Sequence, residues 1–286
     1  MQVATTTFAD RLAAEVERKR SQLVVGIDPR VELMPIEVRR DVARFCCGLI
    51  DAVAPHAVAV KPQLAFFEAL GAAGIAAFEQ VCAYARRAEL LVIADGKRGD
   101  IGSTARAYAD AYLEGNPPRA DALTVNPWLG GDAVEPFLGA VRRGSVGIFV
   151  VVRTSNAGGD LQNATLSDGR PMWHHVAALV DEWGEGTEGD VGLASVGAVV
   201  GATHPRAVAE ARRLMPRAVL LLPGVGAQGA SVGELTRAFQ SGPASALVSA
   251  SRSVNYAFRE TGTDYREAAG AEAARLKREI WAASGW

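Results

Sequence analysis

The sequence predicts an α/β fold in which eight strands and eight helices alternate and close into a single (β/α)8 TIM barrel. Short, almost continuously apolar runs recur along the 286 residues, a pattern typical of parallel strands that are buried on both faces. The segments between these runs are mostly alanine-rich and amphipathic, as expected of helices that cover a sheet. Eight nearly equal units without a break in composition favour a closed barrel over a large doubly wound sheet.

The order of the predicted elements follows from these runs. The predicted strands lie at 23–28, 57–62, 90–95, 122–127, 147–153, 196–202, 218–224 and 246–251. The predicted helices lie at 36–53, 65–88, 103–114, 130–143, 173–184, 204–214, 231–240 and 264–282. An extra amphipathic helix is expected near the N-terminus, with Phe8, Leu12 and Val16 on one face. Because no linker or low-complexity segment divides the chain, residues 1–286 are assigned to one domain.

Two polar segments interrupt the regular alternation. Residues 154–172 form a long polar loop after the fifth strand, on the face of a barrel where catalytic loops lie. Residues 184–195 form a turn rich in glycine and acidic residues before the sixth strand. This turn is expected on the opposite face, away from any catalytic site.

Composition argues against several classes of protein. Lys and Arg total 30 against 32 for Asp and Glu, and no long basic stripe indicates a nucleic-acid binder. No run of about 18 apolar residues predicts a membrane span. The three cysteines, Cys46, Cys47 and Cys82, make a poor disulfide framework and indicate a reducing cytoplasm. No CxxC, HExxH or histidine spacing predicts a bound metal or cofactor.

Charged residues follow the first three predicted strands, where barrel active sites lie. Asp28 ends the first strand, Lys61 the second, and Asp95 and Lys97 the third. Asp95 and Lys97 are two positions apart, so on a strand their side chains share a face, with the two residues roughly 7 Å apart along the chain. An alternating array of this kind keeps lysines protonated, because each close pair interacts by about 4 kcal/mol at an effective dielectric constant of 20. A network that only closes the barrel is the alternative, but buried ion pairs are a weak source of stability.

The segment GVGAQG, residues 224–229, matches the GxGxxG pattern of dinucleotide-binding proteins. It follows the seventh strand, and no acidic residue ends a strand about 20 positions later, so its context contradicts that interpretation. Barrels often bind phosphate with the loops after strands 7 and 8. Here those loops offer the backbone amides near Gly224 and Gly226 and the guanidinium of Arg252. The alternative is that the glycines only shape a turn.

From VVGIDPR at the first strand to SASRS after the eighth, the sequence resembles the orotidine 5′-phosphate decarboxylase family. The most specific segment is DGKRGDI, residues 95–101, which fits the family signature D-x-K-x-x-D. The segments VGID, VKP, TSNAGG and PGVGAQG match the family in the same order. The long loop after the fifth strand is similar to that of the longer bacterial members.

The resemblance implies decarboxylation of orotidine 5′-phosphate to UMP without a cofactor. Lys97 would protonate C6 of the pyrimidine as CO₂ leaves, and Asp95 would face the departing carboxylate. Lys61 and Asp100 would complete the charged array, and Lys61 and Asp28 would also hold ribose hydroxyls.

The resemblance also implies the groups that bind the rest of the substrate. Ser155 would contact the edge of the pyrimidine ring. Gln228 and Arg252 would hold the phosphate, with Gln228 also touching the ring as part of a closing gate. Ser251 stands before Arg252 where shorter family members have glycine, which leaves the backbone donor there open.

A homodimer is implied as well. In the family, residues at the positions of Asp100 and Thr104 enter the active site of the partner subunit. The sequence alone supplies no independent indication of this interface.

Three other functions remain as alternatives. Related sugar-phosphate decarboxylases and synthases use Mg²⁺, but they place an acidic ligand where this chain has Lys61. A Schiff-base aldolase needs a neutral lysine, which flanking carboxylates disfavour. A non-catalytic barrel that binds a phosphoribosyl ligand would have no need of both Lys97 and Asp95.

Overall fold

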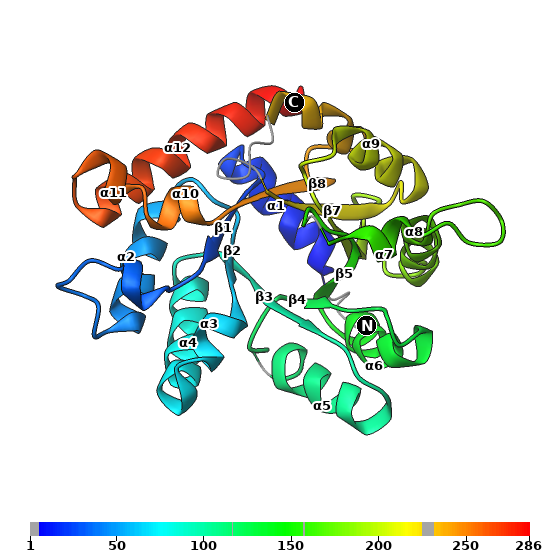
Figure 1. Ribbon diagram of the computed structural model, residues 1–286, viewed down its shortest axis with the longest axis horizontal. Coiled ribbons are helices and arrows are strands. Elements are labelled where there is room, and N and C mark those ends of the chain that lie inside the picture. The colour runs from blue at the N-terminus through cyan, green and yellow to red at the C-terminus, as the bar shows by residue number, and fades with distance from the viewer. Residues whose placement is uncertain (1–5, 116, 157, 225–231) are drawn as a thin grey trace.

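The computed structural model describes residues 6–115, 117–156, 158–224 and 232–286. Its strands are β1 (Leu23–Ile27), β2 (Ala59–Pro62), β3 (Leu91–Arg98), β4 (Ala122–Val125), β5 (Gly147–Arg153), β6 (Ala194–Val200), β7 (Ala218–Pro223) and β8 (Ala246–Ala250). Each strand pairs in parallel with the next, and β8 pairs with β1 to close the barrel (Figure 1). The predicted (β/α)8 barrel is confirmed.

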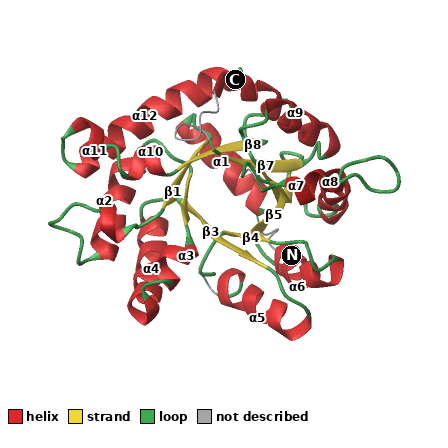
Figure 2. Ribbon diagram, viewed as in Figure 1, coloured by secondary structure: helices red, strands yellow, loops and turns green. Residues whose placement is uncertain are grey.

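Helices surround the ring of strands (Figure 2). The α-helices are α1 (Phe8–Lys19), α2 (Val42–Val53), α3 (Leu64–Glu68), α4 (Gly71–Arg87), α5 (Gly102–Leu113), α6 (Gly131–Arg143), α7 (Asp160–Asn163), α8 (Met172–Trp183), α9 (Pro205–Leu214), α10 (Arg252–Asn255), α11 (Phe258–Thr261) and α12 (Tyr265–Ser284). Two 3₁₀ helices are η1 (Val31–Leu33) and η2 (Val232–Phe239). Within the described ranges, no helix is long and apolar enough to cross a membrane.

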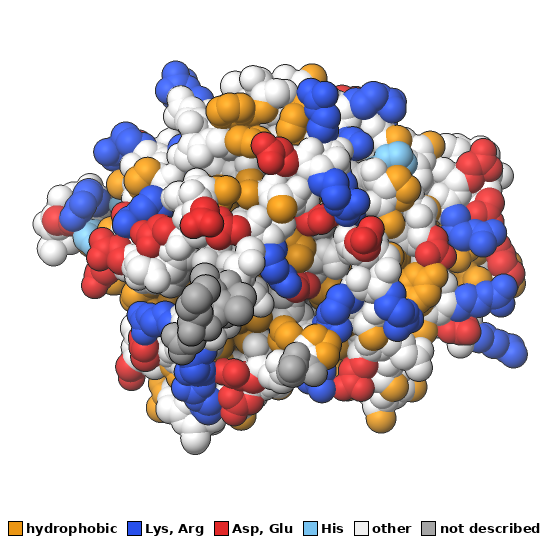
Figure 3. All heavy atoms as spheres, turned by 180° about the vertical axis from the view of Figure 1, so that it is seen from behind, with side chains coloured by type: hydrophobic (Ala, Val, Ile, Leu, Met, Phe, Trp, Pro, Cys, Tyr) orange, Lys and Arg blue, Asp and Glu red, His pale blue; other side chains and the backbone are white. Residues whose placement is uncertain are grey.

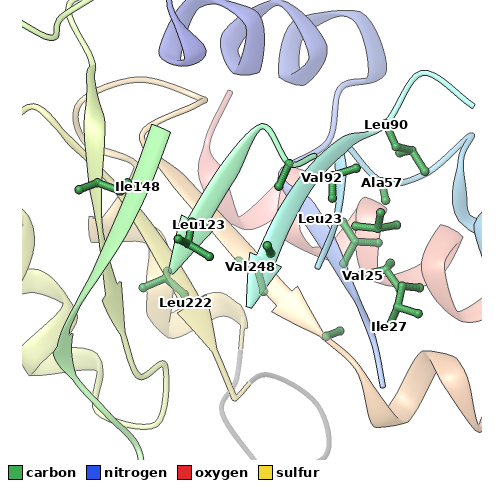
Figure 4. Packing of buried hydrophobic residues seen from close by; sticks show 14 of the residues in the cluster. Leu23, Val25, Ile27, Ala57, Leu90, Val92, Leu123, Ile148, Leu222 and Val248 are labelled. Atoms are coloured by element: carbon green, nitrogen blue, oxygen red, sulfur yellow. The ribbon is translucent and has the colours of Figure 1, made fainter. Parts of the chain in front are cut away.

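Alternate residues of each strand supply two separate apolar cores, because successive side chains point to opposite faces. The outer core lies between strands and helices and includes Leu23, Val25 and Ile27 of β1 (Figure 4). The inner core fills the barrel and includes Val24 of β1 and Ile93 of β3. A polar side chain at an inner position near the carboxyl end of a strand therefore faces the mouth of the barrel, at the end opposite α1.

Helix α1 closes the N-terminal end of the barrel. Phe8, Leu12 and Val16 are all buried and belong to the inner core, so the predicted amphipathic face is confirmed. The ring of Phe8 meets that of Phe149 edge to face, with centroids 6.0 Å apart. Thr7 caps the helix by accepting a hydrogen bond from a backbone N–H of the first turn.

The turn at 184–195 lies beside α1, at the N-terminal ends of the strands. The backbone N–H of Val191 donates to Asp10 Oδ1 at 3.1 Å, and Glu188 pairs with Arg217 at 2.9 Å. The turn thus belongs to the closed end of the barrel, opposite the mouth.

On the face that Figure 3 shows, the described basic and acidic side chains are interspersed.

Three predicted helices differ from the structure. The helix expected at 36–53 begins at Val42, because Asp41 caps it by accepting a hydrogen bond from the Arg44 amide. The helix expected at 65–88 is divided into α3 and α4 at Gly71, whose φ of 65° is left-handed and interrupts the regular helix. Over the described part of 231–240, the chain forms the 3₁₀ helix η2.

Candidate active site

The end of β3 brings together the two charged residues of the DGKRGDI segment. Asp95 has the same strand parity as Ile93 of the inner core and faces the barrel mouth. The Lys97 ammonium donates to Asp95 Oδ1 at 2.6 Å, as the two-residue spacing predicted. β3 runs three residues beyond the predicted end at 95, and Lys97 adopts a left-handed φ of 45°. Non-glycine residues in this region often mark functional sites.

Lys61 reaches the other oxygen of the same carboxylate from the neighbouring strand. Its Nζ lies 2.6 Å from Asp95 Oδ2, so Asp95 stands between two ammonium groups. The side chains of Lys61 and Asp95 are 8% and 7% exposed, whereas that of Lys97 is 44% exposed. Lys97 is therefore the most exposed member of this charged triad.

The triad keeps its charges despite burial. Burial alone would raise the pKa of Asp95, but the charges and hydrogen bonds of Lys61 and Lys97 outweigh it and hold that pKa well below its ordinary value. Burial alone would lower the pKa of Lys61, but the charges of Asp95 and Asp28 raise it above the ordinary lysine value. A protonated Lys61 is a poor nucleophile for a Schiff base.

Asp28 lies near the triad without a direct ion pair to it among the described residues. Its Oδ1 is buried and has no hydrogen-bond partner in that part of the chain. Burial raises the pKa of Asp28, and the charge of Lys61 and the hydroxyl of Ser251 offset only part of this effect. Asp28 therefore offers a buried acceptor oxygen toward the mouth, and the expected array of four charges is a triad with Asp28 beside it.

Thr124 and Asn255, which the sequence patterns did not indicate, form hydrogen bonds at the carboxyl ends of the strands. Thr124 of β4 donates to Asp95 Oδ1 at 3.0 Å and accepts from the Lys97 backbone N–H at 2.9 Å. The buried side-chain amide of Asn255 accepts from Asp28 N at 3.0 Å and donates to Gly26 O at 2.7 Å. Thr124 shares strand parity with the inner core, a signal that the sequence carries, but threonine is also an ordinary strand residue.

Asp100 and Thr104 stand apart from the triad within this chain. The half-buried Asp100 accepts a hydrogen bond from the Ile101 backbone at 2.7 Å, and Thr104 is exposed on α5. Among the described residues, Asp100 forms no ion pair. Within one subunit, Asp100 therefore does not pair with either lysine of the charged triad, although from the sequence it was expected to complete the array.

Ser155 is the second residue of the long loop that follows β5. A Cβ on Gly201 would lie 2.8 Å from the backbone nitrogen of Ser155, so glycine at the end of β6 lets the loop approach the barrel closely. Helix α7 fastens the loop: Gln162 accepts from the Thr154 backbone N–H at 2.8 Å and donates to its hydroxyl at 2.9 Å. Gln162 thus ties α7 to Thr154, the first residue of the loop, next to Ser155.

Only some of the predicted phosphate-binding residues lie within the described part of the chain. Gly224 follows β7 with a φ of 107°, a conformation that favours glycine. Arg252 begins α10 after β8 and is exposed, and it forms no ion pair within the described ranges. Gly226 and Gln228 lie outside those ranges. The two loops leave the same end of adjacent strands, since β7 and β8 are paired.

Comparisons with known proteins agree with this architecture. A family model described as "Orotidine 5′-phosphate decarboxylase / HUMPS family" matches residues 21–275. Orotidine 5′-phosphate decarboxylase of Deinococcus radiodurans is 50% identical over 257 residues, covering 88% of this chain and 90% of the relative. The Rhodopirellula baltica protein of the same name is 44% identical over 270 residues, covering 88% of this chain and 89% of the relative.

Solved structures share the whole fold. A crystal structure from Streptomyces avermitilis has a TM-score of 0.86 at 37% identity and covers 100% of this chain and 99% of its own. The structure of Leishmania donovani OMP decarboxylase has a TM-score of 0.79 at 31% identity, covering 98% of this chain and 100% of its own. The chain therefore belongs to the orotidine 5′-phosphate decarboxylase / HUMPS family.

Proposed function

We propose that this protein decarboxylates orotidine 5′-phosphate to UMP without a cofactor. Family membership supports this reaction, as do relatives of that name at 44% and 50% identity. The observation that carries the proposal is the triad at the barrel mouth, in which Asp95 is bonded to Lys61 and Lys97 at 2.6 Å each. Lys97, whose side chain is 44% exposed, is the group that we propose meets the reacting atom.

Decarboxylation leaves an electron pair on C6 of the pyrimidine, in an sp² orbital that the ring cannot delocalise. A positive charge fixed beside C6 stabilises this carbanion before any proton moves. In our proposal Lys97 supplies that charge and then transfers an Nζ proton to C6, which completes UMP. Asp95 holds the ammonium in place through its 2.6 Å hydrogen bond.

Asp95 has a second proposed role toward the substrate carboxylate. Its pKa is held low by Lys61 and Lys97, so it is ionised at neutral pH. Two carboxylates in one site repel, which would disfavour the bound substrate relative to the state in which CO₂ has left. Lys61 and the buried oxygen of Asp28 would hold the ribose hydroxyls.

The phosphate would be bound across the mouth from the triad. Arg252 and the amides near Gly224 are the proposed partners, together with Gly226, Gln228 and the neighbouring Ser251. Because the phosphate does not react, its binding energy is available to close loops 155–172 and 226–233 over the pyrimidine. Ser155, at the start of the first loop, would contact the ring.

A homodimer would complete the site. Asp100 reaches no cation of its own subunit within the described residues. It is followed by Ile101, which is 57% exposed, and the loop after β4 contains Trp128 and Leu129, which are 62% and 50% exposed. Both segments follow the carboxyl ends of the paired strands β3 and β4, and large exposed apolar side chains are typical of protein interfaces. We propose that this surface binds a second copy, so that the partner's Asp100 and the partner's Thr104 enter the site.

The proposed reaction is tested by the ultraviolet absorbance of orotidine 5′-phosphate mixed with the purified protein in EDTA. We expect conversion to UMP by the wild type and a loss on the order of 10³-fold in Lys97→Ala, because the general acid is removed. Conversion that vanishes in EDTA and returns with Mg²⁺ would contradict a metal-free reaction, and turnover of sugar phosphates with Mg²⁺ in place of orotidine 5′-phosphate would favour the related sugar-phosphate enzymes. A lysine adduct trapped by borohydride would favour an aldolase instead.

A further inference from the structure

Thr124 occupies a place between the two residues on which the proposed reaction depends. It lies in β4, is 1% exposed, and points into the barrel beside the end of β3. Its hydroxyl accepts from the backbone N–H of Lys97 at 2.9 Å and lies 3.0 Å from Asp95 Oδ1. Since the Lys97 amide can only donate, the single hydroxyl proton is directed to the Asp95 carboxylate.

The first of these contacts holds an unusual backbone. The pairing of β3 with β4 shifts register between Ala94 and Arg98, and Lys97 lies within this shift. Its amide donates to the side chain of Thr124 where a regular strand residue would donate to a carbonyl. Lys97 also has a left-handed φ of 45°, which a non-glycine residue adopts only when its surroundings enforce it. Thr124 supplies one of the constraints that keep this conformation.

The second contact fixes the plane of the carboxylate. Asp95 accepts from Lys61 through Oδ2 and from both Lys97 and Thr124 through Oδ1. The two lysines end long, flexible side chains, whereas threonine is β-branched and its hydroxyl is set by one stiff torsion. The donor on β4 is therefore the rigid one of the three.

From this geometry we propose that Thr124 is a positioning residue for the decarboxylation. Its hydroxyl fixes the Lys97 backbone and the Asp95 carboxylate relative to each other, and through them the position of the Lys97 ammonium. The inference rests on the proposed function, because it concerns the placement of the proton donor. Thr124 itself contacts neither substrate nor reacting atoms in this account.

The test compares Thr124→Val, which keeps the shape and removes the hydroxyl, with Thr124→Ser, which keeps the hydroxyl. We expect kcat for orotidine 5′-phosphate to fall about 10- to 100-fold in Thr124→Val, as for the loss of a hydrogen bond to a charged group. The Kd for UMP should change by less than about threefold, because the proposed phosphate and ribose contacts are untouched. Thr124→Ser should restore kcat to within about fivefold of the wild type.

A double variant separates positioning from a general effect on the fold. If Thr124 acts through Lys97, the valine substitution should cost little further activity in a Lys97→Ala background. An equal loss in both backgrounds would overturn the inference. So would an unchanged kcat in Thr124→Val, or a loss of kcat, UMP affinity and melting temperature together that serine does not rescue.

Wild-type turnover in the same assay distinguishes a failure of the proposed decarboxylase function from a failure of the positioning role of Thr124. A wild-type protein that leaves orotidine 5′-phosphate unchanged refutes the proposed function and this inference with it. An active wild type with an unimpaired Thr124→Val refutes the positioning role alone.

Discussion

At the scale of single residues, the site depends on the hydrogen bonds that the Asp95 carboxylate accepts. Its carboxylate accepts from two lysines and one threonine, and it is the largest influence that keeps the buried Lys61 charged. Sequence periodicity was enough to predict that Asp95, Lys97 and Lys61 meet, because strand parity and strand order place them at one mouth. It could not predict the left-handed Lys97 or the role of Thr124, since both depend on a register shift between β3 and β4.

Replacing Asp95 with asparagine should therefore destabilise the protein. Lys61 would lose its main counter-ion, and breaking a buried ion pair typically costs about 3–5 kcal/mol at neutral pH. Asp110→Asn is a matched control, because Asp110 is an exposed residue whose ion pair with Arg106 is 4.0 Å long. We expect that control to change the free energy of unfolding by less than about 0.5 kcal/mol.

The pH dependence of this loss has a defined sign. Without Asp95, burial should lower the pKa of Lys61 in the folded state below its unfolded value of about 10.4. The unfolded state then binds more protons between the two pKa values, so stability rises with pH in that window. Urea unfolding at pH 7 and pH 9 should show the deficit of Asp95→Asn shrinking at the higher pH. A deficit that stays constant or grows contradicts this account of Lys61.

At the scale of elements, apolar runs located all eight strands, but the boundaries of several helices were wrong. Helix α2 begins later because of the cap at Asp41, and the segment 65–88 breaks at Gly71. Both are local hydrogen-bonding or torsional effects that apolar periodicity does not record. The same limit applies to the loop after β5, whose length was evident but whose attachment through Gln162 was not.

The attachment of this loop predicts a role for Gln162 in substrate binding. In Gln162→Ala, both hydrogen bonds to Thr154 are lost, and the loop that carries Ser155 should close less often. We expect KM for orotidine 5′-phosphate to rise about tenfold, the effect of one or two neutral hydrogen bonds, with a smaller fall in kcat. Steady-state kinetics measure both values.

Asn163→Ala provides the comparison within the same short helix. Asn163 is exposed, and its side-chain amide donates to Gly159 O at 3.3 Å, without a hydrogen bond to Thr154 within the described chain. Its removal should leave KM within about twofold of the wild type. Equal kinetic parameters for the two variants would show that the Thr154 contact does not hold the loop.

At the scale of the whole molecule, the sequence predicted the barrel and the helix that closes its N-terminal end. Eight apolar runs separated by amphipathic segments leave few other arrangements, and the apolar face of α1 has a single large surface to cover. What one chain cannot contain is a site shared between subunits. Asp100 belongs to the D-x-K-x-x-D signature, yet it makes no ion pair within the described part of its own subunit.

We propose that Lys97 and the partner's Asp100 act in one decarboxylase site. The most direct test of this proposal is the activity of two purified heterodimers that contain the same substitutions in different arrangements. One joins a Lys97→Ala subunit to an Asp100→Ala subunit, and the other joins a wild-type subunit to a subunit carrying both substitutions. We predict about half of wild-type turnover for the first, because one of its sites keeps both groups, and almost none for the second. The reverse pattern would contradict the account, since it would place Lys97 and Asp100 in the site of the same subunit.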